Sequence, residues 1–174
     1  MGRPLFVTFC LAGSLPASRS YSRISVKRTS SFQHMDTQLD TPRQGPLYLR
    51  MPGIAQIVAT ALRTGESYCL HEWVIMPNHV HVLFTPHMEP PPILRRWKGG
   101  TARAANLLLA RTGKPFWQEE SYDRLVRDPK EFEAIRHYIR MNPVRARLAR
   151  TPEDFPWSSA FSPPPPPSPE TPPP

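Results

Sequence analysis

Hydrophobic and polar positions follow two periodicities along this chain, and the changes between them define seven elements. Short runs rich in Val, Ile, Leu and Phe, bounded by turn residues, predict four β-strands. These runs are residues 4–11, 67–76, 79–85 and 122–127. Apolar residues that recur every three to four positions predict three helices. They lie at about residues 52–64, 93–112 and 129–142. The first six elements, in the order strand, helix, strand, strand, helix, strand, match a ferredoxin-like βαββαβ layout.

The second and third strands are predicted to form an antiparallel hairpin around a turn at Pro77 and Asn78. Apolar and aromatic residues fall on both faces of the second strand, which predicts a central strand covered on both sides. His79 and His81 are two residues apart on the third strand, so their side chains leave the same face. We expect the two rings to converge on the exposed face of the sheet. Rings on opposite faces, or rings packed beneath a helix, would remove the argument for a metal site.

Two imidazoles side by side on a rigid strand provide half of a metal site. Taken alone, the His-x-His pattern is more typical of two polar residues on a solvated face. The last helix adds a second set of candidate residues. Asp128 is suited to cap its start, and Pro143 is expected to end it. Tyr138 and Asn142 are four positions apart on this helix and therefore share a face. The alternative is that Tyr138 lines the core and Asn142 only ends the helix.

Basic residues surround a glycine pair in the second predicted helix. They are Arg95, Arg96, Lys98 and Arg103. We expect Gly99 and Gly100 to break or begin the helix, with Thr101 as an N-cap. Amide groups at such a helix start, beside these cations, would suit a phosphate group. A solvated basic face with a flexible glycine pair accounts for the same residues equally well.

The overall charge supports an anionic partner. The formal net charge is +8 at pH 7 and the isoelectric point is about 10.1, which favours nucleic acid ahead of a membrane. No apolar run has the length of a transmembrane helix. Cys10 and Cys69 provide neither a disulfide framework nor a four-cysteine zinc site, and they suit a reducing cytosol. The first residues resemble a weak secretory signal, but Thr8 interrupts the short apolar run, which favours a β-strand.

We expect one domain over residues 1–162 and a proline-rich disordered tail over residues 163–174. Residues 12–46 are dense in Ser, Arg, Thr and Gln, and they are expected to form an irregular basic insertion.

Two motifs lie in a fixed order on these elements. They are Met-Pro-Asn-His79-Val-His81 on the third strand and His-Tyr138-Ile-Arg-Met-Asn142-Pro-Val-Arg on the last helix. The combination resembles the single-tyrosine HUH transposases, and among them the REP-associated tyrosine transposases. The resemblance extends to residues 47–58, 98–102, 116–118, 122–124 and 157–160. His-x-His alone is a weak motif, but the full set in this order is specific. It implies an α+β fold, a ferredoxin-like sandwich with an additional C-terminal helix that carries the tyrosine.

The resemblance further implies a metal-dependent transposase that cleaves and rejoins single-stranded DNA through a 5′-phosphotyrosine. Tyr138 would be the nucleophile, His79 and His81 catalytic metal ligands, and Asn142 the third ligand. The implied cofactor is Mg²⁺ or Mn²⁺, although imidazole also suits zinc. The implied partner is single-stranded or hairpin DNA, such as REP-like palindromes, bound by the basic residues and Thr101. The protein would act as a monomer or homodimer in the bacterial cytoplasm, at the nucleoid. The competing interpretation is a catalytically inactive, domesticated ferredoxin-like nucleic-acid-binding protein, because residues 12–44 depart from the family pattern.

Overall fold

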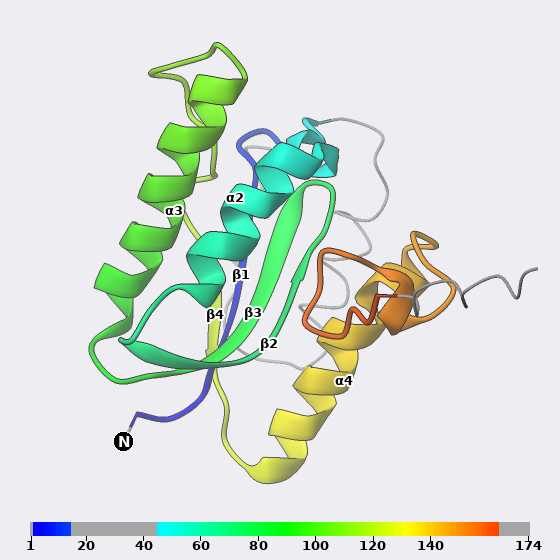
Figure 1. Ribbon diagram of the computed structural model, residues 1–174. Helices are drawn as coiled ribbons and strands as arrows, with labels where there is room; N and C mark the ends of the chain where they lie inside the picture. The colour runs from blue at the N-terminus through cyan, green and yellow to red at the C-terminus, as the bar shows by residue number, and fades with distance from the viewer. Residues whose placement is uncertain (1, 15–44, 164–174) are drawn as a thin grey trace, which may run out of the picture.

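A computed structural model describes residues 2–14 and 45–163 and contains one antiparallel sheet with helices on both faces (Figure 1). The sheet has the strand order β2-β3-β1-β4. Its strands are β1 (Leu5–Cys10), β2 (Tyr68–Ile75), β3 (His79–Pro86) and β4 (Tyr122–Leu125). The helices are α2 (Pro52–Arg63), α3 (Pro90–Leu108) and α4 (Pro129–Arg145), with 3-10 turns η3 (Tyr48–Arg50) and η4 (Pro152–Asp154). The predicted α+β class and the order βαββαβ followed by a further helix are confirmed. The proline-rich tail and most of the 12–46 insertion lie outside the described residues.

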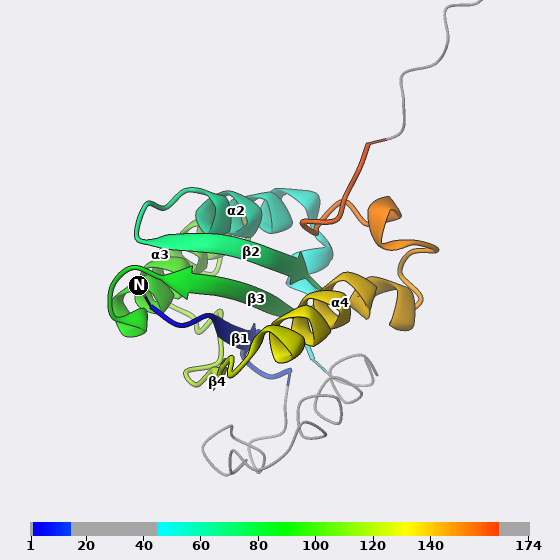
Figure 2. The ribbon, with the colours of Figure 1, turned by 90° about the horizontal axis from the view of Figure 1, so that it is seen from below.

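The sheet is covered by two separate helical layers, as Figure 2 shows. Helices α2 and α3 lie on one face, and α4 lies on the other. The central strand β1 is buried throughout, because its alternate residues serve two cores. Val7 and Phe9 join the core under α2 and α3, whereas Phe6 and Cys10 join the core under α4. No helix within the described ranges is both long and apolar enough to cross a membrane.

A β-bulge in β2 brings most of its apolar residues onto one face, although they occupy both odd and even positions in the sequence. The pairing of β2 with β3 shifts between Leu70 and Glu72, which leaves His71 as the extra residue. Before the bulge, Leu70 packs toward α2 and α3, and after it Trp73, three positions later, packs on the same side. The prediction of a central strand is therefore wrong, because β2 lies at the edge of the sheet.

Helix α3 starts earlier than predicted and is continuous. Residues 90–92 are all proline and form its first turn, where a missing N–H breaks no helical hydrogen bond. Gly99 and Gly100 lie in the middle of the helix, and a Cβ atom added to either would meet nothing within 4 Å. The predicted helix break is wrong, and Thr101 is not an N-cap.

Helix α4 begins as predicted, because the Asp128 side chain accepts a hydrogen bond of 2.8 Å from the backbone N–H of Glu131. It ends three residues later than the predicted position 142. Pro143 lies in its last turn, and the helix continues to Arg145.

Candidate active site

His79 and His81 converge from β3 onto the α4 side of the sheet. Their ring centroids are 4.7 Å apart, and their Nε2 atoms are 3.1 Å apart. The prediction that they share a face is confirmed. The prediction of an exposed face is wrong, because the two residues are only 0% and 1% exposed. The cause is α4, which packs against β2 and β3. Because the pair is packed beneath α4, the sequence-based argument for a metal site no longer holds, and any such site depends on the geometry of the imidazoles.

Each imidazole is oriented by a polar contact to its other nitrogen. His79 Nδ1 lies 2.7 Å from Asn78 Oδ1, and His81 Nδ1 lies 2.7 Å from the hydroxyl oxygen of Thr8 on β1. A carbonyl oxygen can only accept, so this contact suits the His79 tautomer that donates from Nδ1, which in a neutral ring leaves a lone pair on Nε2. Neither orienting role was predicted from the sequence. The available sign was Thr8 itself, a hydroxyl within an otherwise apolar strand.

The facing Nε2 atoms suit either a divalent cation or a direct hydrogen bond. For nitrogens 3.1 Å apart, a cation about 2.1 Å from each would make an N–cation–N angle of about 95°. This angle lies between the octahedral and tetrahedral values. With Thr8 donating to Nδ1, His81 can instead donate from Nε2 to His79. Within residues 2–14 and 45–163, no cluster of three His, Cys, Asp or Glu residues is placed to hold a metal. Any such site therefore needs other oxygen donors, and an amide such as that of Asn142 is one.

Tyr138, on α4, lies next to the histidine pair of the same chain. Its ring centroid is 5.6 Å from that of His81 and 6.2 Å from that of Phe6. Tyr138 is 6% exposed, and Asn142, one helical turn later, is 1% exposed. The structure thus buries Tyr138 and Asn142 on the side of α4 that faces the sheet. Arg145 was missed by the sequence analysis, and its guanidinium lies 5.1 Å from the centre of the Tyr138 ring.

The predicted DNA-binding residues differ in their availability. Arg95, Arg96 and Arg103, which we refer to as the α3 arginines, are exposed. Lys98 is half-buried, its ammonium donates to the backbone oxygen of Glu119 at 2.6 Å, and burial lowers its pKa. The α3 arginines and Lys98 lie on the face of the sheet opposite Tyr138, so the structure does not bring the two groups together (Figure 2).

Thr101 is not placed to contact a phosphate. It is 2% exposed, and its hydroxyl donates to the backbone oxygen of Trp97 at 2.6 Å. The hydroxyl oxygen of Thr101 also accepts from the indole N–H of Trp117 at 2.9 Å. Since α3 does not start here, the predicted phosphate site at a helix start is wrong.

Comparison with known proteins finds related sequences and a related fold. The family model described as "Transposase IS200 like" matches residues 53–142, more than half of the chain. A REP-associated tyrosine transposase of Escherichia coli (strain K12) is 26% identical over 101 residues, which cover 56% of this chain and 58% of that relative. The chain therefore spans less than two thirds of the relative's length.

A solved structure of a REP-associated tyrosine transposase bound to a REP hairpin aligns with a TM-score of 0.56 and 19% identity. The alignment covers 91% of this chain and 76% of the other, and it supports the shared fold. The family match includes His79, His81, Tyr138 and Asn142. The resemblance to the REP-associated tyrosine transposases is confirmed, and the chain belongs to the IS200-like transposase family.

Proposed function

We propose that this chain cleaves and rejoins single-stranded DNA through a 5′-phosphotyrosine at Tyr138. The proposal is carried by the cluster of Tyr138, His79 and His81, in which the Tyr138 and His81 rings are 5.6 Å apart. These residues come from two elements of one chain, so the proposed chemistry needs no second copy. Family membership supports the same reaction class.

In the proposed reaction, the Tyr138 hydroxyl oxygen attacks the phosphorus of a phosphodiester. A bond forms between Tyr138 and phosphorus, and the bond from phosphorus to the 3′ oxygen breaks. The phenolic proton leaves Tyr138, and the departing strand ends as a free 3′-hydroxyl. The reverse attack by a 3′-hydroxyl rejoins the strand without a nucleotide cofactor, because the covalent bond retains the energy of the phosphodiester.

Free tyrosine has a pKa of about 10, so the hydroxyl needs help to react near neutral pH. In the proposal, His79 and His81 hold Mg²⁺ or Mn²⁺, with Asn142 as the third ligand. The bound ion would neutralise charge on a nonbridging phosphate oxygen. Thr8 and Asn78 would keep the two imidazoles turned toward that ion, as they turn them toward each other here.

The proposed substrate is hairpin DNA with single-stranded flanks. The solved structure of a REP-associated tyrosine transposase contains a REP hairpin. In this chain, the α3 arginines are exposed and the net charge is +8. Affinity supplied by phosphate contacts falls as salt increases. We therefore propose that the α3 arginines hold DNA on one face of the sheet while Tyr138 acts on the other.

A second candidate is an inactive DNA-binding protein, and one observation favours it. Tyr138, His79 and His81 are 6%, 0% and 1% exposed, so DNA reaches them only if α4 moves. A helix that never moves would leave a structural core with the family's residues and no cleavage.

In the test, the parent, Tyr138→Phe and Tyr122→Phe are each incubated with hairpin DNA and Mn²⁺. Any covalent adduct is then identified by mass spectrometry. Tyr122 is a matched control, because its ring is 6.3 Å from Phe6 while that of Tyr138 is 6.2 Å away. The parent and Tyr122→Phe should form an adduct; Tyr138→Phe should bind the hairpin and form none. An adduct in Tyr138→Phe contradicts the proposed nucleophile. Hairpin binding without an adduct in the parent, with either Mg²⁺ or Mn²⁺, supports the second candidate.

A further inference from the structure

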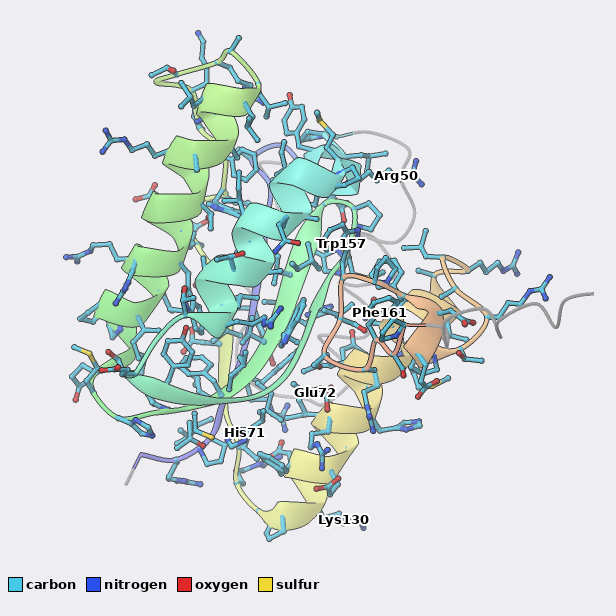
Figure 3. The ribbon with its side chains drawn as sticks, in the orientation of Figure 1. Arg50, His71, Glu72, Lys130, Trp157 and Phe161 are labelled. Carbon is cyan, nitrogen blue, oxygen red and sulfur yellow. The ribbon has the colours of Figure 1, made fainter. Side chains whose placement is uncertain are left out.

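A buried carboxylate on β2 connects the sheet to the helix that carries Tyr138. Glu72 is 3% exposed, and Figure 3 shows it on the side of β2 nearest α4. Arg136 Nε donates to its Oε2 atom at 3.4 Å, and Arg140 Nε lies 3.7 Å from Oε1. A buried carboxylate is costly unless it is paired and hydrogen-bonded. The bulge at His71 makes this pairing possible, since it sets which face of the sheet Glu72 occupies.

The C-terminal segment adds a third anchor to the same carboxylate. The hydroxyl of Ser159 donates to Glu72 Oε1. Residues 157–159 run along the outer edge of β2, where Ile75 N–H donates to the oxygen of Trp157 at 2.8 Å and Ser159 N–H to the oxygen of Trp73 at 3.0 Å. Glu72 is therefore held between an edge-pairing segment and two arginines of α4.

These anchors constrain the rotation of α4 about its axis. Arg136 and Arg140 are four residues apart and lie on one side of the helix. Tyr138 lies between them in sequence, about 200° around the helix from Arg136, and therefore points away from that side. Its side faces His81, which pairs with Val74, two residues after Glu72 on β2. Fixing the two arginines to Glu72 thus fixes the direction of Tyr138.

We propose that Glu72 is a positioning residue for the nucleophile, acting through Arg136 and Arg140 with support from Ser159. These four residues form an α4 clamp that docks the helix so that Tyr138 faces His81 of the same chain. The catalytic consequence rests on the proposed function of Tyr138. The structural consequence, which is the orientation of the Tyr138 ring over His81, does not depend on that proposed function.

The test compares Glu72→Gln with Glu133→Gln. Glu133 is a matched control, because it also accepts from Arg136, at 3.1 Å, but it is exposed on α4 and does not reach the sheet. Three quantities are measured: hairpin affinity without metal, the single-turnover rate of adduct formation at saturating hairpin, and the NMR shifts of the His81 ring protons. The shifts report the nearby Tyr138 ring, and Tyr138→Leu gives the reference without it. Unfolding curves confirm that each variant is folded at the assay temperature.

We expect Glu72→Gln to slow adduct formation at least tenfold and to bind the hairpin no more weakly than the parent. Its His81 signals should move toward those of Tyr138→Leu, whereas Glu133→Gln should change neither rate nor signals. Adding Arg136→Gln to Glu72→Gln should slow the reaction no further, because both act through one contact. If Glu72→Gln does not fold, Ser159→Ala replaces it, with an expected loss of at least twofold and the same direction of shift.

A Glu72→Gln rate equal to or above that of the parent overturns the catalytic part of this proposal. Unmoved His81 signals, or equal effects from Glu133→Gln, overturn the clamp itself. A parent that forms no adduct refutes the proposed function instead, and the His81 signals then decide the clamp alone.

Discussion

The hydroxyl of Thr8 gives the sharpest test of the proposed metal site. Thr8 is fully buried on β1, opposite His81, and its hydroxyl oxygen is 2.7 Å from His81 Nδ1. Thr8→Val preserves the shape of the side chain and removes this hydrogen bond. Groups that orient a histidine ligand typically change metal affinity by about 10–100-fold. That range corresponds to about 1.4–2.7 kcal/mol. The unfolding free energy should also fall by about 1–3 kcal/mol, because the buried Nδ1 atom loses its partner.

The assay is a Mn²⁺ titration by calorimetry or electron paramagnetic resonance, without DNA. Thr85→Val is the matched control, because Thr85 makes the same 2.7 Å contact with the Nε2 atom of His71, which is not part of the site. We expect weaker Mn²⁺ binding in Thr8→Val and parent-like binding in Thr85→Val. Equal Mn²⁺ affinity in Thr8→Val and the parent, or equal weakening by both changes, would refute the orienting role. A parent that binds no Mn²⁺ would refute the site.

Two further predictions concern charge. Replacing all three α3 arginines by Gln should weaken hairpin binding and make it less dependent on salt. The slope of log affinity against log salt concentration should become shallower by about 0.7–0.9 for each phosphate that the variant no longer neutralises. An unchanged slope would argue against DNA binding by these arginines. Burial acts to raise the pKa of Glu131, but hydrogen bonds from Arg127 and Arg124 outweigh it and lower this pKa from 4.5 to about 2. The full shift would be worth about 3.4 kcal/mol, which solvent around the exposed Arg127 reduces to about 1–2 kcal/mol. Because the folded pKa is the lower one, Glu131→Gln should be less stable than the parent above about pH 5, and the difference should fade as the pH drops from 4.5 toward 2. Denaturant unfolding at several pH values measures this, and a constant difference would contradict it.

Local features of the chain predicted the geometry of the histidine pair. A turn at Pro77 and Asn78 with strands on both sides requires only neighbouring residues, and the two-residue period of a strand then places His79 and His81 on one face. The cap at Asp128 was predictable for the same reason, since its hydrogen bond closes within three residues. Features that depend on sequence spacing alone were therefore recovered.

Burial of the pair was not predictable, because it depends on how α4 docks on a sheet that is distant in sequence. The contact between Glu72 and Arg136 spans 64 residues. The bulge at His71 also escapes a sequence pattern, since it inverts the alternation on which face assignment relies. Because the sequence alone does not reveal the bulge, the apolar residues at both odd and even positions of β2 resembled those of a central strand.

Thr101 shows how a local rule fails when tertiary packing opposes it. A threonine after two glycines favours a helix start, but each glycine within a helix costs only about 1 kcal/mol relative to alanine. Trp97 and Ala105, on either side of the pair, are buried in the same core and keep the helix continuous. The hydroxyl is then used inside the protein, by Trp117, which lies 16 residues away in sequence.

Helix α4 has to move away for DNA to enter the site, but it has to be docked for Tyr138 to be aligned. The site is closed while α4 is docked, so a strand enters only when the helix is displaced. A displaced helix cannot bring Tyr138 to the phosphate, so the proposed reaction requires α4 to dock again with the strand in place. When strand entry is faster than cleavage, the rate at saturating hairpin depends on the fraction of molecules in which α4 is docked again. Loss of Glu72 lowers that fraction, which is why a slower reaction is expected although the site becomes more open. Hydrogen exchange of α4 amides with and without hairpin measures the displacement directly. Faster exchange with hairpin supports the transposase reaction, whereas unchanged exchange without an adduct means that α4 serves only as core.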